Sequence, residues 1–234
     1  MNSTLTTIIR ERGSETENGN GSPTLVISFE ETRNIAEETR ISPKEVEIEA
    51  LQLGIIPTRY LRNIPTLGAE GQLRLLSSSV AVVGAGGLGG LVIELLARLG
   101  TGRLVVIDGD VYNEDNLNRQ ILAREKDLGR SKARRARERV VEINSAVEVS
   151  ARTVFLDPEN AEELLTGADL IIDALDRIDV RILLEDAARR LDIPLVHGAI
   201  GGFLGEIATI IPGEDTLHSL YRQTAGENQG PESE

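Results

Sequence analysis

A short glycine-rich segment constrains the fold of this chain more than any other feature of its sequence. Gly84, Gly86 and Gly89 form the pattern G-x-G-x-x-G. They directly follow Val80–Val83, an apolar run bounded by small residues, which predicts a buried strand. A helix is expected over residues 88–99, immediately after the glycines. This arrangement would let backbone N–H groups approach phosphate oxygens at the N-terminus of the helix.

Beyond this turn, apolar strands alternate with amphipathic helices along the chain. Continuous apolar strands separated by such helices are typical of a parallel sheet that is covered on both faces. The sequence therefore predicts a doubly wound, Rossmann-like α/β fold with a mostly parallel sheet. The predicted strands cover residues 103–107, 147–154 and 170–174, and the predicted helices cover residues 131–143, 158–165 and 180–191.

The residues before the first strand predict an N-terminal extension. Ser42, Pro43 and Glu45 have the spacing of a capping box with proline at the first helical position. Residues 13–22 are polar and rich in Gly, Asn and Glu, so they offer nothing to bury. Four segments are predicted: a disordered tail over 1–22, a helical extension over 23–78, a nucleotide-binding Rossmann-like domain over 79–222, and a flexible, truncated C-terminal segment over 223–234.

Charge and composition exclude several classes of function. The formal net charge of −13 argues against a nucleic-acid partner, because binding one depends on neutralising phosphates. The chain has no cysteine, which excludes a disulfide scaffold, a thiolate zinc site and a catalytic thiol. No apolar run reaches the length of a membrane span, and the N-terminus lacks the pattern of a secretory signal. A cytoplasmic protein without a membrane partner is expected.

Two aspartates are expected at the carboxyl edge of the sheet, where ligands of open α/β folds bind. Asp108 ends the strand 103–107, and its carboxylate can accept hydrogen bonds from ribose hydroxyls. NAD and ATP both carry such a ribose, so Asp108 does not distinguish them. Asp176 lies past the strand 170–174 and could hold Mg²⁺ alongside phosphates, whereas Asp173 is interpreted as a possible helix or turn partner.

The loop after Asp108 carries more polar side chains than a connection needs. Arg119 and Lys132 can neutralise triphosphate oxygens, and the helix that starts near Ser131 adds N–H donors. His197 is interpreted as a core histidine. The arginines of that helix are interpreted as a solvated face: Arg134, Arg135, Arg137 and Arg139.

Taken together, these motifs resemble the ThiF/MoeB/HesA group of ubiquitin-activating-enzyme-like adenylyltransferases. The resemblance covers residues 43–222 in the order of the family. The motifs that carry it are RYLRN, VVGAGGLGG, the strand end at Asp108, NLNRQ, GRSK, DALDRIDVR and PLVHGAIGGF.

The resemblance implies a function and a role for each motif. Members of this group bind ATP with Mg²⁺ and adenylate the C-terminal glycine carboxylate of a small ubiquitin-fold sulfur-carrier protein ending in Gly-Gly, releasing pyrophosphate. The implied roles are nucleotide binding for Gly84, Gly86 and Gly89, ribose binding for Asp108, contacts to the phosphates for Asn116, Arg119, Gln120 and Lys132, magnesium binding for Asp176, and an arginine finger for Arg62 that reaches the other subunit of a homodimer.

The sequence also departs from this group. GEDTLHSLYRQ stands where many members have the C-Y-R-C element of a structural zinc site, so no zinc is expected. Arg177 follows Asp176 where many relatives have Asn. An NAD-dependent oxidoreductase, an enzyme like the tRNA threonylcarbamoyladenosine dehydratases and a non-catalytic nucleotide-binding module remain alternatives. The sequence does not identify the carrier protein or its pathway.

Overall fold

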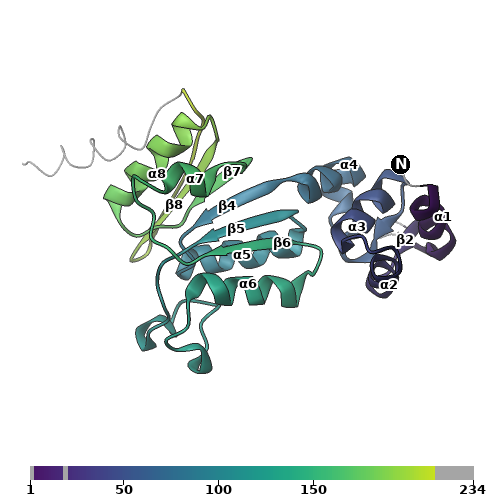
Figure 1. Ribbon diagram of the computed structural model, residues 1–234, viewed down its shortest axis with the longest axis horizontal. Coiled ribbons are helices and arrows are strands. Elements are labelled where there is room, and N and C mark those ends of the chain that lie inside the picture. Colours follow the sequence, from purple (N-terminus) through teal and green to yellow (C-terminus); the bar gives the residue numbers. More distant parts are fainter. Residues whose placement is uncertain (1–2, 18–20, 214–234) are drawn as a thin grey trace, which may run out of the picture. The chain divides into compact units, whose positions relative to one another are not determined.

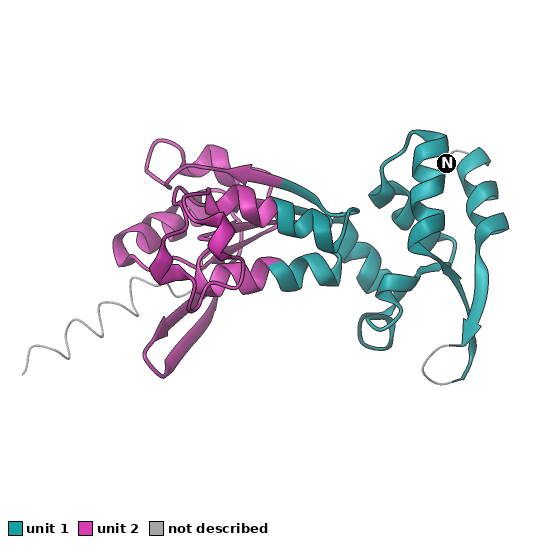
Figure 2. Cartoon of the chain, turned by 90° about the horizontal axis from the view of Figure 1, so that it is seen from below, with its two compact units in different colours: residues 1–78, 94–104, 138–149 teal, residues 79–93, 105–137, 150–234 magenta. Residues whose placement is uncertain are grey.

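The computed structural model describes residues 3–17 and 21–213. The chain forms two compact units (Figure 2). Because it passes between them several times, some helices and strands contribute residues to both. The first unit comprises residues 1–78, 94–104 and 138–149, and the second comprises residues 79–93, 105–137 and 150–234.

A small sheet and several helices form the N-terminal part of the first unit. In the sheet, β1 pairs with β2 in antiparallel orientation and β2 pairs with β3 in parallel orientation. The elements are α1 (Ser3–Arg12), β1 (Ser14–Glu17), β2 (Pro23–Ile27), α2 (Phe29–Thr39), α3 (Pro43–Gln52), β3 (Ile56–Pro57), the 3-10 helix η1 (Thr58–Tyr60) and α4 (Ile64–Ser77).

The capping box predicted at Ser42 is present at the start of α3. The Ser42 hydroxyl accepts a hydrogen bond from the Glu45 N–H at 3.2 Å, and the Glu45 carboxylate accepts one from the Ser42 N–H at 2.9 Å. These two bonds satisfy backbone donors that a helix N-terminus otherwise leaves unpaired, which fixes where α3 begins.

The expectation of a disordered tail over residues 1–22 differs from the structure. Residues 3–12 form the helix α1, and residues 14–17 form the strand β1. Leu5 and Ile9 lie four residues apart on one face of α1, where they are buried against a cluster that includes Ile35. The polar composition of the following residues concealed this apolar face of the helix.

A six-stranded sheet in the order β6-β5-β4-β7-β8-β9 carries the glycine-rich turn (Figure 1). β7 pairs in parallel with both β4 and β8, and β9 pairs antiparallel to β8. The predicted α/β fold, with a mostly parallel sheet flanked by helices, is confirmed. The elements are β4 (Ser79–Val83), α5 (Gly87–Leu99), β5 (Arg103–Ile107), the 3-10 helices η2 (Glu114–Asn116) and η3 (Glu125–Asp127), α6 (Lys132–Ile143), β6 (Glu148–Arg152), α7 (Ala161–Leu165), β7 (Leu170–Asp173), α8 (Ile178–Arg190), β8 (Leu195–Gly201) and β9 (Leu204–Ile210).

The core of the second unit lies between the central strands and the helix α8. Val83, Ile171 and Leu195 come from β4, β7 and β8, and they pack in one cluster with Leu184 of α8. All five residues of β4 are buried, which explains why this strand reads as a continuous apolar run. None of the helices in the described part of the chain is long and apolar enough to span a bilayer.

Candidate functional site

The glycine-rich turn after β4 is closed so tightly that side chains are excluded from it. Gly84 has a φ of +94°, and a Cβ added there would lie 2.6 Å from the carbonyl oxygen of Ala174. A Cβ added at Gly89 would lie 1.9 Å from the carbonyl oxygen of Gly84. Glycine alone satisfies the positive φ and the close approach. The turn is therefore fixed between the start of α5 and the segment that follows β7.

Asp108 lies beside this turn at the end of β5. Its carboxylate accepts hydrogen bonds from the N–H groups of Ala85, at 2.7 Å, and Asp110, at 2.8 Å. Burial raises the pKa of Asp108, although the two backbone N–H groups and the charge of Lys132 partly oppose this effect. Because one oxygen accepts from each amide, the carboxylate is held rigidly at the edge of the sheet and keeps further acceptor capacity.

Lys132 occupies the first position of α6, and its side chain is mostly buried. Its Nζ lies 3.1 Å from Oδ2 of Asp110, and its N–H donates to the Asp110 carbonyl oxygen at 3.0 Å. A lysine at a helix N-terminus opposes the helix dipole, so it needs a compensating anion. Asp110 provides one here, and the three donors of the ammonium group leave it able to contact a second anion.

The loop that contains η2 lies against the glycine-rich turn. A Cβ added at Gly86 would lie 3.7 Å from Nε2 of Gln120, and one added at Gly87 would lie 3.6 Å from the carbonyl oxygen of Arg119. Gln120 is buried, and its Oε1 has no hydrogen-bond partner within the described residues. An unpaired buried amide oxygen is costly, so a ligand donor at this position would relieve that cost.

Asn116 and Arg119 of the same loop differ in their contacts and in their exposure. Asn116 holds the loop with both ends of its amide, since its Oδ1 accepts from the Asn113 N–H and its Nδ2 donates to Asp115, each at 3.1 Å. Arg119 is exposed, and its Nη1 donates to the Asp115 carbonyl oxygen at 2.6 Å. The structure thus gives Asn116 a loop-holding contact and leaves the guanidinium of Arg119 accessible at the edge of the site.

The segment after β7 completes this edge. Asp173 is fully buried and accepts a hydrogen bond from the Leu175 N–H at 2.9 Å, so its interpretation as a turn partner agrees with the structure. Asp176 is exposed three residues later. No cluster of three or more His, Asp or Glu side chains within the described residues could hold a metal ion together. Asp176 offers a single carboxylate, which suits Mg²⁺ when phosphates and water supply its other ligands.

The sequence analysis also singled out Arg62, His197 and the C-terminal segments. Arg62 is exposed and belongs to the first unit. His197 is fully buried, as the interpretation of a core histidine requires. The segment GEDTLHSLYRQ, which stands in the place of the zinc element, lies outside the described residues apart from its first glycine, and so does the segment 223–234.

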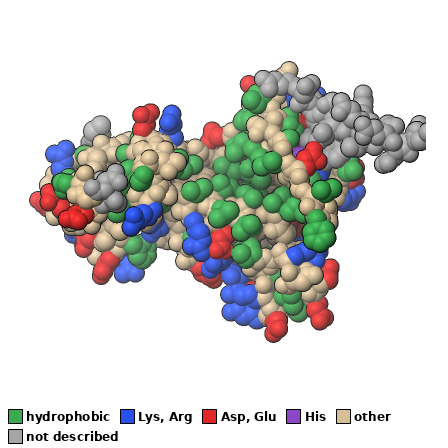
Figure 3. Space-filling model, turned by 180° about the vertical axis from the view of Figure 1, so that it is seen from behind, with side chains coloured by type: hydrophobic (Ala, Val, Ile, Leu, Met, Phe, Trp, Pro, Cys, Tyr) green, Lys and Arg blue, Asp and Glu red, His purple; other side chains and the backbone are tan. Residues whose placement is uncertain are grey.

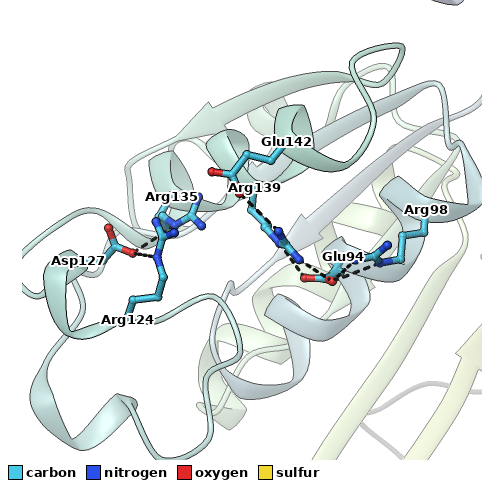
Figure 4. Close-up of polar contacts among 7 residues, drawn as sticks. All are labelled: Glu94, Arg98, Arg124, Asp127, Arg135, Arg139 and Glu142. Carbon is cyan, nitrogen blue, oxygen red and sulfur yellow. Dashed lines mark hydrogen bonds and ion pairs between the residues drawn. The ribbon is translucent and has the colours of Figure 1, made fainter. Parts of the chain in front are cut away.

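One buried cluster escaped the sequence analysis. The Asp127 carboxylate is fully buried and pairs with Arg124 at 2.6 Å, Arg130 at 2.8 Å and Arg135 at 3.3 Å. Figure 4 shows Arg124 and Arg135 directed toward this carboxylate. Arg135 is therefore not part of a solvated helix face, because its side chain is only 3% exposed. The ion pairs fasten the loop before α6 to that helix.

Comparisons with known proteins identify a family for this chain. The family model described as "ThiF family" matches residues 59–233. The SAMP-activating enzyme E1 of Haloferax volcanii is 42% identical over 75% of this chain and 64% of its own length. The sulfur carrier protein adenylyltransferase of Thermus thermophilus is 44% identical over 68% of this chain and 59% of its own length. The chain thus matches less than two thirds of the length of these relatives.

A solved structure shares both the fold and part of the sequence. The E. coli tRNA N6-threonylcarbamoyladenosine dehydratase TcdA, in complex with ATP, superimposes with a TM-score of 0.61. It is 33% identical and covers 63% of this chain and 61% of its own. Since the family model covers well over half of the sequence, from Arg59 onward, the chain belongs to the ThiF family.

Proposed function

We propose that this protein is an adenylyltransferase that activates the C-terminal glycine carboxylate of a small ubiquitin-fold sulfur-carrier protein ending in Gly-Gly. The observation that carries the proposal is the meeting of the glycine-rich turn with the loop of Arg119 and Gln120, beside Asp108 and Lys132. The names of the two relatives, a SAMP-activating enzyme and a sulfur carrier protein adenylyltransferase, support the same class of substrate.

ATP fits the groups at this edge of the sheet. The turn and the start of α5 offer backbone N–H groups to phosphates, and Asp108 offers acceptors to ribose hydroxyls. Gln120 has an unpaired Oε1 that faces no donor of the described chain. Arg119 and Lys132 supply positive charge for a triphosphate, which favours ATP over a dinucleotide.

The reaction needs no nucleophile from this chain. A carboxylate oxygen of the carrier attacks the α-phosphorus of ATP and forms a new P–O bond. The bond from the α-phosphorus to the oxygen that bridges it to the β-phosphorus breaks. Pyrophosphate leaves with that electron pair, and the product is an acyl adenylate. Positioning and neutralisation of the developing charge can therefore supply the catalysis, in agreement with the absence of cysteine.

Mg²⁺ fits the same proposal. When bound, this ion polarises the phosphoryl oxygens and shields their charge from the incoming carboxylate. Asp176 would hold it from the segment after β7. The neighbouring Arg177 pairs with Asp179, so its guanidinium has an anionic partner besides Asp176.

We also propose that the protein is a homodimer in which Arg62 reaches the site of the other subunit. Hydrophobic side chains gather on one face of the second unit (Figure 3). Phe203, Leu204 and Ile207 of the β8–β9 hairpin are each at least 80% exposed, and Leu91 of α5 is 44% exposed. Exposed apolar patches commonly mark surfaces that a protein partner covers.

Calorimetric titration with ATP plus Mg²⁺, and separately with NAD⁺, tests the nucleotide. Magnesium-dependent binding of ATP is expected, and Arg119→Ala should weaken it at least tenfold. Arg137→Ala is the matched control, because Arg137 is an exposed arginine of α6 that makes none of the contacts described at the site. Binding of NAD⁺ alone would overturn the proposal.

Isotope exchange between pyrophosphate and ATP tests the chemistry. A small ubiquitin-fold protein ending in Gly-Gly should stimulate exchange, and the same protein without its last glycine should not. Asp176→Ala should abolish the exchange. Equal exchange with and without the terminal glycine would contradict adenylation of that carboxylate.

A mixing experiment tests the role of Arg62. Neither Arg62→Ala nor Asp176→Ala alone should support exchange. A mixed dimer of the two variants would contain one site with both an intact Asp176 and an intact Arg62 from the other subunit. Mixing should therefore restore activity, whereas action of Arg62 within its own subunit predicts no recovery.

A further inference from the structure

We propose that His197, Asp173 and Arg181 form a buried positioning cluster that fixes the backbone of Leu175 and so holds the Asp176 carboxylate in place for Mg²⁺. This inference rests on the proposed function, since it concerns the same nucleotide site. It assigns a role to three buried polar side chains that need not touch the nucleotide themselves. They would act through the segment that follows β7.

The pairing of two strands brings the cluster together. In the parallel pair β7 and β8, Asp173 lies opposite His197. Nδ1 of His197 lies 2.6 Å from Oδ2 of Asp173, and both side chains are fully buried. With Nδ1 protonated, His197 donates to the carboxylate and fixes its orientation. The other oxygen of Asp173 is then directed at the Leu175 N–H, which it binds at 2.9 Å.

Arg181 holds the same segment from α8. Its guanidinium donates to the Leu175 carbonyl oxygen through both Nε and Nη2. Nη2 also lies 3.4 Å from the carbonyl oxygen of Gly198 on β8, and Nε lies 3.8 Å from the Asp173 carboxylate. The side chain is 8% exposed. Arg181 thus connects β8, Asp173 and the carbonyl group next to Asp176.

Leu175 consequently has both of its backbone groups held by charged side chains. Backbone groups outside regular structure are paired with backbone, with side chains in caps and turns, or with water. Here the N–H is held from β7 and the C=O from α8, directly before the residue proposed to bind Mg²⁺. The preceding Ala174 is confined as well, because its N–H donates to Val83 at 2.9 Å and its carbonyl oxygen abuts Gly84.

The arrangement agrees with what a metal-binding carboxylate requires. Groups that orient a ligand from behind commonly change metal affinity about 10–100-fold when they are removed. A buried charge is also costly unless it is paired, so an apolar residue at these positions would be the simpler way to fill the core. Charged groups that hold both backbone groups of Leu175 fix the position of the backbone from which the exposed Asp176 side chain extends.

The test measures the Mg²⁺ concentration that half-saturates ATP binding, together with ATP binding in the absence of Mg²⁺. His197→Leu should raise the half-saturating Mg²⁺ concentration about tenfold or more, with little change in metal-free ATP affinity. His197→Asn retains a donor near the position of Nδ1 and should restore the wild-type value to within about threefold. Hydrogen exchange of the ligand-free protein should show faster exchange of the Leu175 amide in His197→Leu.

Two further variants separate positioning from general stability. Asp169→Ala is the matched control, because Asp169 binds the Ser79 N–H at 2.8 Å near the opposite end of β7. It should leave the Mg²⁺ dependence unchanged. Arg181→Lys retains the charge but loses the two-donor contact to Leu175, so it should also raise the half-saturating concentration, and it serves if His197→Leu does not fold. Unchanged Mg²⁺ dependence in the folded variants would overturn the inference.

The outcome is distinguishable from failure of the proposed function. If the wild-type protein shows no magnesium-dependent binding of ATP, the proposed function itself is wrong and the inference falls with it. If the wild type binds ATP with Mg²⁺ and only the inference is wrong, the wild type and the folded variants have the same Mg²⁺ dependence. Restoration by His197→Asn supports the donor role of His197.

Discussion

Two fully buried carboxylates, one in each unit, are surrounded by different numbers of cationic donors. Glu47 of α3 lies in the first unit, where it accepts from the Tyr60 hydroxyl at 2.9 Å and lies 3.3 Å from Nε of Arg59. Asp127 lies in the second unit and pairs with three arginines. Both side chains are inaccessible to solvent, but Asp127 has three cationic partners and Glu47 has one.

The partners shift the two pKa values in opposite directions. Burial raises the pKa of Glu47 to about 6, and the charge of Arg59 and the Tyr60 hydroxyl only partly oppose it. Burial also raises the pKa of Asp127, but the hydrogen bonds and charges of its arginines outweigh it, so that the pKa lies below its usual value. The comparison teaches that three arginines can outweigh the effect of burial on a carboxylate, whereas one arginine and a hydroxyl do not.

The largest expected effect comes from removing the carboxylate of the second unit. Asp127→Ala would remove the buried anion that Arg124, Arg130 and the nearly inaccessible Arg135 share. We expect the free energy of unfolding of this unit to fall by about 3–5 kcal/mol, as for other broken buried ion pairs. Urea denaturation measures this loss of stability, and hydrogen exchange of amides in α6 shows whether it is local to that helix.

The control for this variant is Glu125→Ala, an exposed acidic residue in the same 3-10 helix. It should change the free energy of unfolding by less than about 0.5 kcal/mol. The pH dependence offers a second check. Since the folded pKa of Asp127 is depressed, its stabilisation is present above the unfolded pKa and is lost as pH falls through the folded pKa. Equal acid sensitivity of the wild type and Asp127→Asn would contradict this assignment.

A smaller loss of stability is expected when the Tyr60 hydroxyl, which contacts Glu47 in the first unit, is removed. The Tyr60 hydroxyl donates to Glu47 and accepts from Nδ2 of Asn144, each at 2.9 Å. Tyr60→Phe removes a partner from both groups at once, so we expect a loss of about 2 kcal/mol. Thermal unfolding of the variant measures it. Because Asn144 also donates to the Ala97 carbonyl oxygen, a loss near zero would show that Asn144 and Glu47 find other partners.

Local patterns in the sequence predict the strands of the six-stranded sheet better than they predict the elements of the N-terminal region. The strand expected over 103–107 coincides with β5, because its apolar residues form an unbroken run. The strand β1 consists of the residues SETE, which are mostly exposed and carry no alternation. Its pairing with β2 depends on tertiary contacts rather than on local preference, so the sequence alone did not indicate it.

The candidate site shows the same limit. Gly84 and Asp108 can be placed from motif spacing, because the turn and the strand end are local features. The pairing of His197 with Asp173 depends on the register of two strands that are separated in the sequence by α8. The sequence predicts an exposed Arg135, because its partner Asp127 lies in a loop, where no helical or strand periodicity indicates which side chains are buried.

The comparison also predicts a pH effect in the first unit. The folded pKa of Glu47, about 6, is above the ordinary 4.5, so its contribution to stability is present below pH 4.5 and is lost as pH rises through 6. Each pKa unit corresponds to about 1.4 kcal/mol, so the loss is about 2 kcal/mol. Glu47→Gln cannot ionise, and the variant should gain that amount relative to the wild type between pH 4 and pH 7.

Urea denaturation of both proteins at several pH values measures this relative gain. Glu45→Gln serves as a control, because the Glu45 carboxylate is exposed and its pKa is lowered by the Ser42 N–H rather than raised. Its pH dependence should therefore have the opposite sign. A constant difference between Glu47→Gln and the wild type across this range would show that Glu47 does not titrate near pH 6.

The smallest expected effect on stability concerns Glu94, which has two arginine partners, compared with one for Glu47 and three for Asp127. Glu94 of α5 pairs with Arg139 at 3.0 Å and with Arg98 at 2.8 Å (Figure 4). Its pKa is lowered, with the hydrogen bonds from Arg139 as the largest cause and those from Arg98 a smaller one opposing the effect of burial. The Arg98 side chain is 54% exposed, against 32% for Arg139, so water screens its charge more strongly.

Arg98→Ala should therefore lower the free energy of unfolding by no more than about 0.5 kcal/mol, the usual value for an exposed pair one helical turn apart. Each arginine donates two hydrogen bonds to Glu94, and Arg139→Ala should cost more because Arg139 is the less exposed of the two. Titration of the Glu94 carboxyl carbon by NMR should show a larger rise in pKa for Arg139→Ala than for Arg98→Ala. Equal rises would mean that the number of arginines, and not their burial, sets the ionisation of a carboxylate in this protein.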